Sequence, residues 1–213
     1  MTEKTLKKLK NFFSAYELKK SKKGELLFKP EEDKGGVVFI KKGYARAYTL
    51  SSEGEERTLA MVKPLFYCSL LGAVTGKKSP FYFEAISPIE MWVAPKEDFL
   101  RYIAKESGLY EELTISLLLE LSELTINAQT LISGSAENKI GSLILRLSER
   151  FGEKEKGGIR IKFSIPHRII ASMTGLTRET VTLQILKMEK EKVLKKEKRS
   201  LIVIDKEKLA EMA

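Results

Sequence analysis

The chain has 213 residues, of which 43% are hydrophobic and 31% are charged. This balance suits a globular protein of two small domains and excludes an intrinsically disordered chain. The net charge is +9, and residues 137–213 hold 18 lysines and arginines against 11 aspartates and glutamates. A basic excess concentrated in the last third indicates a polyanionic partner, either nucleic acid or an anionic membrane; a solvated lysine-rich surface is the alternative.

One cysteine and one histidine exclude several kinds of site. They are too few for a disulfide framework, a four-cysteine iron–sulfur or zinc site, or the multi-histidine centre of a metal-dependent β-barrel enzyme. No catalytic motif such as a nucleophile elbow or phosphate loop stands out, so we do not expect an enzyme. Because the sequence has neither a signal-peptide core nor a run of about 18 apolar residues, we expect a cytoplasmic protein with no membrane partner.

The first half of the chain has the pattern of one helix followed by short strands. Residues 6–16 predict an N-terminal helix. Runs of β-branched and aromatic residues, separated by glycine- and serine-rich turns, then predict strands. These strands cover residues 37–40, 44–50, 58–62, 81–86 and 89–93. Many short strands at this spacing predict a sandwich or a barrel.

Helical periodicity begins at residues 96–105 and continues over residues 108–136. In the longer helix, apolar residues recur at alternating steps of three and four, which forms a heptad seam. The central seam positions are Leu117, Leu121, Leu124, Ala128 and Leu131. A second apolar set lies off the seam, at Ile115, Leu118, Leu119, Ile126 and Ile132. We expect the second set to pack on the β-domain and the seam to pack on the same helix of a second subunit; a helix buried within one domain is the alternative.

Gly134 is expected to end this long helix, and either Ser135 or Asn138 is expected to cap the next one. An apolar stripe then continues to Phe151. A charged loop is predicted at residues 153–158, and the alternation of residues 159–163 predicts a half-buried strand.

Residues 166–188 have the pattern of a helix-turn-helix. Pro166 suits the first turn of a helix, Gly175 ends that helix, and Thr177 is a good N-cap for the next one. The inward positions of the second helix are Val181, Ile185 and Met188. The basic segment 195–200 and the apolar run 201–204 then predict a hairpin that lies along the phosphate backbone as a wing.

The outward side chains of the second helix carry the chemistry of base recognition. They are Arg178, Glu179, Thr182, Leu183 and Lys187. Arg178 offers a fork donor suited to guanine O6 and N7, and Glu179 offers an acceptor for cytosine N4. A surface ion pair between these two residues is the alternative interpretation.

The segment Leu176-Thr177-Arg178-Glu179-Thr180-Val181, with a short strand after it, resembles the recognition helix of the cyclic-AMP receptor / fumarate-nitrate reduction regulator (CRP/FNR) family. Residues 34–48, 52–56 and 95–99 resemble the family's strand pair, hairpin and post-barrel helix start. The resemblance covers nearly the whole chain and implies an α+β fold. That fold has a cyclic-nucleotide-binding-like β-barrel or jelly roll (1–107), a dimerisation helix (108–136) and a winged helix-turn-helix (137–213).

The resemblance also implies a function, that of a homodimeric transcription regulator controlled by an effector in the barrel. Its partners would be double-stranded DNA with near-palindromic half-sites about 34 Å apart, and RNA polymerase if it is an activator. Residues implied near phosphates or base edges are Thr177, Thr180, His167, Arg168, Lys196, Lys198 and Arg199. Leu183 stands where many family members have a second arginine, and it would touch a thymine methyl. A small-molecule sensor without operator binding is the alternative function.

Cyclic-AMP binders of the family carry a Gly-Glu pair in the turn after their sixth strand and, soon after it, an Arg-Ser pair that grips the phosphate. The matching residues here are Tyr67-Cys68 and Phe81-Tyr82, which offer no charged or fork donor to a phosphate diester. We therefore predict that cyclic AMP does not bind in the usual way. The aromatic side chains either line an apolar pocket or fill the barrel. Candidate effector-pocket residues are Tyr67, Cys68, Leu70, Phe81, Tyr82, Thr125 and Asn127. No cofactor is required: a single cysteine excludes an iron–sulfur cluster, and Cys68 is either a haem ligand or, more simply, a small buried residue.

Overall fold

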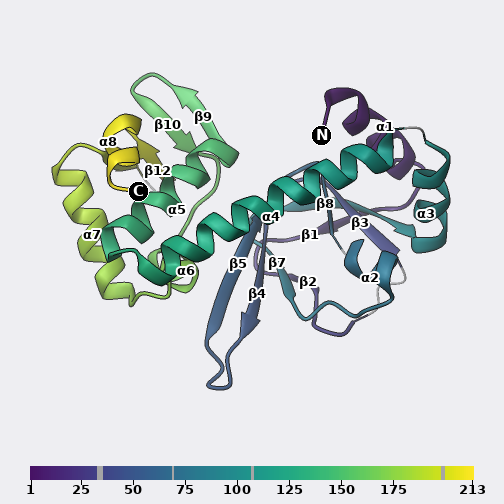
Figure 1. The fold of residues 1–213 in the computed structure, drawn as a ribbon, viewed down its shortest axis with the longest axis horizontal. Coiled ribbons are helices and arrows are strands. Elements are labelled where there is room, and N and C mark those ends of the chain that lie inside the picture. Colours follow the sequence, from purple (N-terminus) through teal and green to yellow (C-terminus); the bar gives the residue numbers. More distant parts are fainter. Residues whose placement is uncertain (33–35, 69, 107, 198–199) are drawn as a thin grey trace. The chain divides into compact units, whose positions relative to one another are not determined.

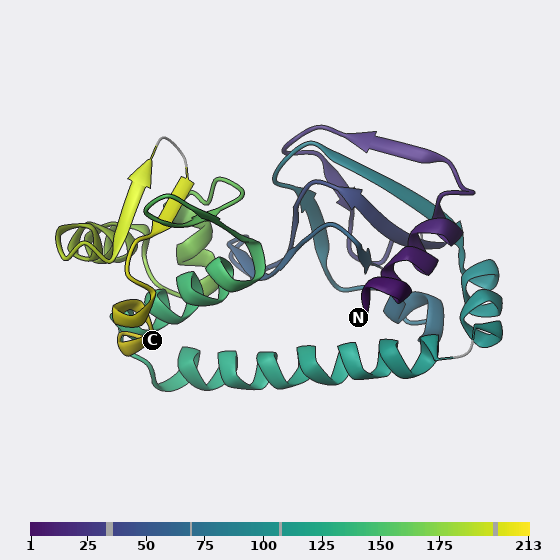
Figure 2. The same ribbon diagram turned by 90° about the horizontal axis from the view of Figure 1, so that it is seen from above.

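The structure is a computed structural model that describes residues 1–32, 36–68, 70–106, 108–197 and 200–213. The chain divides into two compact units, which are residues 1–50 with 59–123 and residues 51–58 with 124–213. Figures 1 and 2 show the elements in two views. The helices are α1 (Glu3–Phe13), α2 (Leu70–Thr75), α3 (Lys96–Lys105), α4 (Leu109–Ser133), α5 (Ala136–Phe151), α6 (His167–Thr174), α7 (Arg178–Lys190) and α8 (Lys206–Glu211). The strands are β1 (Leu18–Ser21), β2 (Leu26–Phe28), β3 (Gly36–Lys42), β4 (Ala45–Leu50), β5 (Glu56–Val62), β6 (Phe66–Cys68), β7 (Tyr82–Ala85), β8 (Ile89–Pro95), β9 (Gly152–Glu155), β10 (Gly158–Ile161), β11 (Leu194–Glu197) and β12 (Ser200–Val203).

Two four-stranded sheets form the N-terminal β-domain, in the orders β1-β8-β3-β6 and β2-β7-β4-β5. The β3/β8, β3/β6, β2/β7 and β4/β7 pairs are antiparallel. A buried cluster draws side chains from both sheets, among them Val38, Ile40 and Met91 from one and Phe28 and Ala85 from the other. The expected jelly-roll architecture is therefore confirmed, although hydrogen bonds among the described residues do not close the sheets into one barrel.

A second buried cluster covers the other face of the β3/β8 sheet. Alternate residues of these strands, such as Phe39 and Trp92, point to this face and pack against α1, α3 and the start of α4. Phe13 of α1 stacks on Phe39 with ring centroids 4.8 Å apart. The sheet is therefore buried on both faces, which explains why β3 reads as a continuous apolar run.

The five predicted strands are found with small shifts of their ends, but several elements were missed. Strands β1, β2 and β6 and helices α2 and α8 were missed because each is too short, at three to six residues, to show a period. The helix predicted over residues 6–16 begins earlier, because the Thr2 side chain caps it by accepting from Thr5 N–H at 3.3 Å. The charged segment 153–158, predicted as a loop, instead supplies edge strand β9, which pairs with β10.

Helix α4 buries only Leu109 and Leu113 in this chain. The off-seam residues Ile115, Leu118 and Leu119 are 49–61% exposed, so the expectation that this set packs on the β-domain is wrong. Leu109 and Leu113, at the start of the helix, make that contact instead. Among the described residues, no helix has the length and apolar content needed to cross a membrane.

The second unit contains α5 to α8 and a sheet in the order β11-β12-β10-β9. The predicted break at Gly134 is confirmed, since α4 ends at Ser133. Ser135 and Asn138 form a reciprocal capping box at the start of α5, in which each side chain accepts from the other's backbone N–H at 3.1 Å. Buried residues of α5, including Ile140, Ile144 and Leu147, form the inner side of this unit.

Candidate DNA-binding surface

The helix-turn-helix is built by local signals that the sequence already shows. Pro166 is the N-cap of α6, and Gly175 follows the helix with φ +67°, a left-handed conformation that glycine adopts without strain. The Thr177 hydroxyl caps α7 by accepting from Thr180 N–H at 3.1 Å. The predicted inward side chains of α7 are all buried, at Val181, Ile185 and Met188.

The N-terminal turn of α7 presents a donor and an acceptor to solvent. Arg178 and Glu179 are both exposed. They make no ion pair with each other or with another charged residue in the described part of the chain, so the ion-pair interpretation is not supported. Leu183, one turn further along, is 68% exposed. The surface thus offers a fork donor, a carboxylate and an apolar side chain within two turns of one helix, the three groups that read base edges.

A hydrogen-bond chain joins α6 to α7 beneath this surface. His167 Nδ1 lies 2.8 Å from Thr182 Oγ1, and the Thr182 hydroxyl donates to the Arg178 carbonyl at 2.8 Å. Thr182 is half-buried. Its hydroxyl is therefore used inside the motif, and we expect it to position α7 rather than to read a base.

A depression of about 480 Å³ opens between α6, the start of α7 and β11. Its wall residues are Ser164, Ile165, Pro166, His167, Arg168, Arg178 and Lys196. The depression brings together four of the predicted DNA-binding residues from three elements, and it holds three cations and no carboxylate.

The wing forms as predicted, with β11 and β12 paired antiparallel and β12 paired in turn with β10. Lys196 N–H donates to Glu189 Oε1 of α7 at 2.8 Å, which holds the hairpin against the recognition helix. Two of the predicted wing cations, Lys198 and Arg199, lie outside the described residues.

Lys187 has a different setting from the other predicted contact residues. Its Nζ donates to both carboxylate oxygens of Glu137 on α5, at 3.0 and 3.1 Å. This partner raises the pKa of Lys187 by hydrogen bonding and charge. Reaching DNA would require Lys187 to leave that partner, so its place in the contact set stays a prediction.

The seam of α4 is exposed along its length. Leu117, Leu121 and Leu124 are 49–61% exposed and Leu131 is 39% exposed. An apolar stripe of this length is rarely left to solvent, and a second copy of the helix would cover it.

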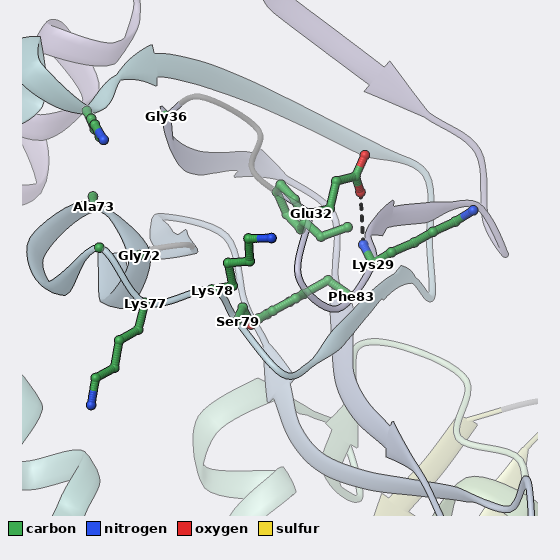
Figure 3. Close-up of a pocket in the computed structure, with 12 residues that line it drawn as sticks. Lys29, Glu32, Gly36, Gly72, Ala73, Lys77, Lys78, Ser79 and Phe83 are labelled. Atoms are coloured by element: carbon green, nitrogen blue, oxygen red, sulfur yellow. Dashed lines mark hydrogen bonds between the residues drawn. The ribbon is translucent and has the colours of Figure 1, made fainter.

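A pocket of about 130 Å³ lies in the β-domain between β2, α2 and β7. Figure 3 shows the Lys78 side chain extending toward Glu32 on the far wall, whereas Lys77 points away. Glu32 accepts a hydrogen bond from Lys29 N–H at 3.0 Å. Glycines 36, 72 and 76 form part of the wall. None of the predicted effector-pocket residues lines this pocket.

The predicted effector-pocket residues of the β-domain are dispersed. Tyr67, expected in a turn, lies in β6 and is buried under the helices, where burial and then Glu120 raise its pKa to about 12. Cys68 is buried between the sheets. Leu70, Phe81 and Tyr82 are half-buried, and Tyr82 stacks on Tyr48 with ring centroids 5.0 Å apart. Most of these side chains therefore fill the interior of the domain rather than line an apolar pocket.

Cys68 has a setting that disfavours metal ligation. Burial raises the pKa of its thiol to about 12, and iron is bound by the thiolate. The surrounding residues therefore do not fit a haem at this position.

Sequence reasoning missed Lys78 and the bond between His167 and Thr182. The run Lys77-Lys78-Ser79-Pro80 is one of the turn signals between the predicted strands, although a basic loop that follows a glycine is also a signal for anion binding. Nothing in the sequence pairs His167 with Thr182, because the contact depends on how α6 crosses α7.

Comparisons with known proteins agree with this arrangement. Residues 18–106 match the family model of the cyclic nucleotide-binding domain, and residues 138–212 match that of the Crp-like helix-turn-helix domain. The global nitrogen regulator of Synechocystis sp. is 30% identical over 168 residues, which are 75% of this chain and 72% of that protein. The chain belongs to the CRP/FNR family.

Further relatives support the same family. The global nitrogen regulator of Nostoc sp. is 28% identical to this CRP/FNR protein over 187 residues, covering 85% of this chain and 82% of the relative. FixK2 from Bradyrhizobium japonicum has the same fold, with a TM-score of 0.80, 18% identity and coverage of 92% and 96% of the two chains. A CRP/FNR family regulator from Thermus thermophilus gives a TM-score of 0.74 at 22% identity, covering 92% and 98%.

Family membership confirms the main functional predictions. This CRP/FNR protein is a DNA-binding transcription regulator, not an enzyme, with an effector-sensing N-terminal domain. Regulators of this family dimerise, which accounts for the exposed seam of α4.

Proposed function

We propose that this regulator binds a near-palindromic operator as a homodimer and reads each half-site with Arg178 and Glu179. The observation that carries the proposal is the exposure of both side chains, unpaired among the described residues, on the first turn of α7 beside a basic wing. Arg178 would donate to guanine O6 and N7, and Glu179 would accept from cytosine N4. Thr177 and Thr180 at the same helix end, with Lys196 and Arg168, would fix the register on the phosphates.

The direct test is selection of binding sites from random duplexes, followed by the Arg178→Ala variant. We expect a two-fold symmetric site, and a loss of about 1–3 kcal/mol with relaxed preference at one base position per half-site. Lys195→Ala is the matched control, because this exposed wing residue would weaken binding to all sequences equally. If Arg178→Ala also acted on all sequences equally, the base-reading role would be wrong.

Salt dependence separates this proposal from a sensor module without operator binding. Phosphate contacts make affinity fall steeply with salt. A protein with no salt-dependent affinity for any duplex would support the sensor alternative.

The effector is proposed to bind the pocket between β2, α2 and β7. Lys78 supplies an ammonium group to this pocket. This group suits a small anionic ligand, and the lining residues offer no fork donor for a cyclic phosphate diester. Asn127 of α4 is a candidate reporter across the dimer, since its Oδ1 is buried and has no hydrogen-bond partner among the described residues; Thr125 is proposed to act with it.

Thermal shift measurements test the effector proposal. Inorganic phosphate, simple mono- and dicarboxylates and cyclic AMP would be added to the protein and to Lys78→Met. We expect one of the compact anions to raise the Tm of the wild type alone and cyclic AMP to have no effect. A shift by cyclic AMP at micromolar concentration would contradict the assignment.

The regulator is proposed to act in the cytoplasm, on the DNA held there. As an activator it would contact RNA polymerase. Transcription in vitro, with and without the selected operator, decides between activation and repression.

A further inference from the structure

The depression beside α7 combines three cations with one imidazole. Arg168, Arg178 and Lys196 line it together with His167, and no acidic residue does. Arg168 also forms an ion pair with Glu56, whose Oε2 lies 3.7 Å from Nη1. Arg178 and Lys196 have no carboxylate partner among the described residues, and two such cations form a site for an anion. The depression adjoins the first turn of the recognition helix, so a backbone phosphate of bound DNA would be the anion nearest to it.

The hydrogen bond to Thr182 fixes which nitrogen of His167 carries the proton. The Thr182 hydroxyl has one proton and directs it to the Arg178 carbonyl, 2.8 Å away. With the hydroxyl proton on that carbonyl, we assign Nδ1–H of His167 as the donor to Thr182 Oγ1, at 2.8 Å. In the neutral ring this leaves a lone pair at Nε2, which is buried and has no hydrogen-bond partner among the described residues.

The groups around His167 keep the ring neutral in the free protein. Burial, then Lys196 of β11 and Arg178 of α7, lower the pKa of His167 below its usual 6.5, while Glu189 of α7 opposes them. Arg168 follows it on α6. A neutral Nε2 has no proton to donate, and the oxygens of a phosphate diester only accept.

We infer that a DNA backbone phosphate occupies this depression and that His167 takes up one proton from solvent when it does. The inference rests on the proposed function, because it requires α7 to lie on DNA. The phosphate charge offsets Arg178 and Lys196, which removes the repulsion that holds the ring neutral.

The sign of the pH dependence follows from linkage. DNA raises the pKa of His167, so the bound state holds more protons than the free state between the two pKa values. Affinity then rises as the pH falls through that window, by up to about tenfold per pH unit for one proton. The chain has one histidine, and burial moves the pKa of Cys68 to about 12. Between about pH 5.5 and 7, where carboxylates and lysines do not normally titrate, the effect is assigned to His167.

The single histidine makes the measurement direct. The imidazole NMR signal of the full-length protein is titrated with pH, alone and with a 20-base-pair duplex of mixed sequence at low ionic strength, where phosphate contacts form without an operator. We expect DNA to raise the pKa of His167 by about one unit or more. A pKa that DNA leaves unchanged or lowers overturns the inference, and this readout needs no variant to fold.

Fluorescence anisotropy with the same duplex supplies the second readout. Affinity of the wild type should rise as the pH falls from 7.5 to 5.5, whereas His167→Gln should bind about equally at both pH values. Lys196→Gln is the control: it should weaken binding at every pH and reduce the salt slope by about one. Salt-dependent binding with no pH dependence overturns the proton uptake but leaves the DNA-binding proposal standing. No binding to any duplex overturns both.

Discussion

Arg46 and Glu84 lie directly opposite each other on β4 and β7, and Arg46 Nε donates to Glu84 Oε2 at 2.9 Å. The Nη2 atom donates to the same oxygen at 2.5 Å. The guanidinium also lies over the ring of Tyr48, 4.3 Å from its centroid. The Arg46 side chain is only 1% exposed and that of Glu84 is 17% exposed, so this is an ion pair largely removed from water.

Breaking this pair should destabilise the β-domain strongly. Glu84→Leu leaves a buried guanidinium without its carboxylate, and we expect a loss of about 3–5 kcal/mol of unfolding free energy. The double variant Arg46→Met/Glu84→Leu removes both charges and should recover most of that loss. Urea unfolding of the wild type, both single variants and the double variant measures the coupling. If the double variant were as unstable as the sum of the singles, the pair would not be coupled.

The helix-turn-helix could be predicted from sequence because its signals are local. Gly175 and Thr177 mark the turn within three residues, and the burial of Val181 and Ile185 follows from helical spacing. The heptad seam was equally readable, since Leu121 and its neighbours repeat over several turns.

The β-domain was harder, because its sites are assembled from segments distant in sequence. Lys78 and Glu32 face the same pocket although 46 positions separate their numbers in the sequence. The family resemblance implies a turn at Tyr67 and Cys68, whereas both residues are buried in strand β6. The pairing of Arg46 with Glu84 depends on the register between strands β4 and β7, and no local sequence pattern predicts that register.

Glu112 should stabilise the N-terminus in a pH-dependent way. It accepts from Thr2 N–H and Thr2 Oγ1 at 2.7 Å and from Thr5 Oγ1 at 2.6 Å, so α4 holds the start of α1. These bonds, that of Thr5 first, lower the pKa of Glu112 to about 2. Because the pKa of Glu112 is lower in the folded than in the unfolded protein, the ionised carboxylate stabilises the folded state at pH values above its unfolded pKa of about 4.3. This stabilisation is lost as the pH falls through the folded pKa.

The measurement compares urea midpoints of the wild type and Glu112→Gln between pH 7 and pH 2. The wild type should be more stable at pH 7, and the difference should shrink as the pH falls below about 4.5. Glu111→Gln, next along the exposed side of the helix, should behave like the wild type. A difference that persists unchanged to pH 2 would show that the charge of Glu112 is not responsible.

Leu121→Lys should break the dimer. Leu121 is 61% exposed in one chain and lies mid-seam, where a second helix would bury it. A lysine there places a charge in the interface of each subunit. Light scattering after size exclusion should give about twice 24.2 kDa for the wild type and a mass near 24.2 kDa for the variant. Leu71→Lys on α2, also exposed at 48%, is the control and should remain dimeric; dissociation of both variants would remove the seam as the explanation.

Leu183 should read the methyl group of a thymine. Its side chain is 68% exposed on α7, one turn beyond Glu179, and it has no polar atom with which to bond a base. Leu183→Ala withdraws the apolar contact, so preference at one A·T position per half-site should fall by about 1 kcal/mol. Uracil differs from thymine only by lacking this methyl, which gives a chemical counterpart to the substitution. Replacing that thymine by uracil should weaken wild-type binding by a similar amount and leave Leu183→Ala unaffected. Equal weakening of both proteins by uracil would assign the methyl contact to another residue.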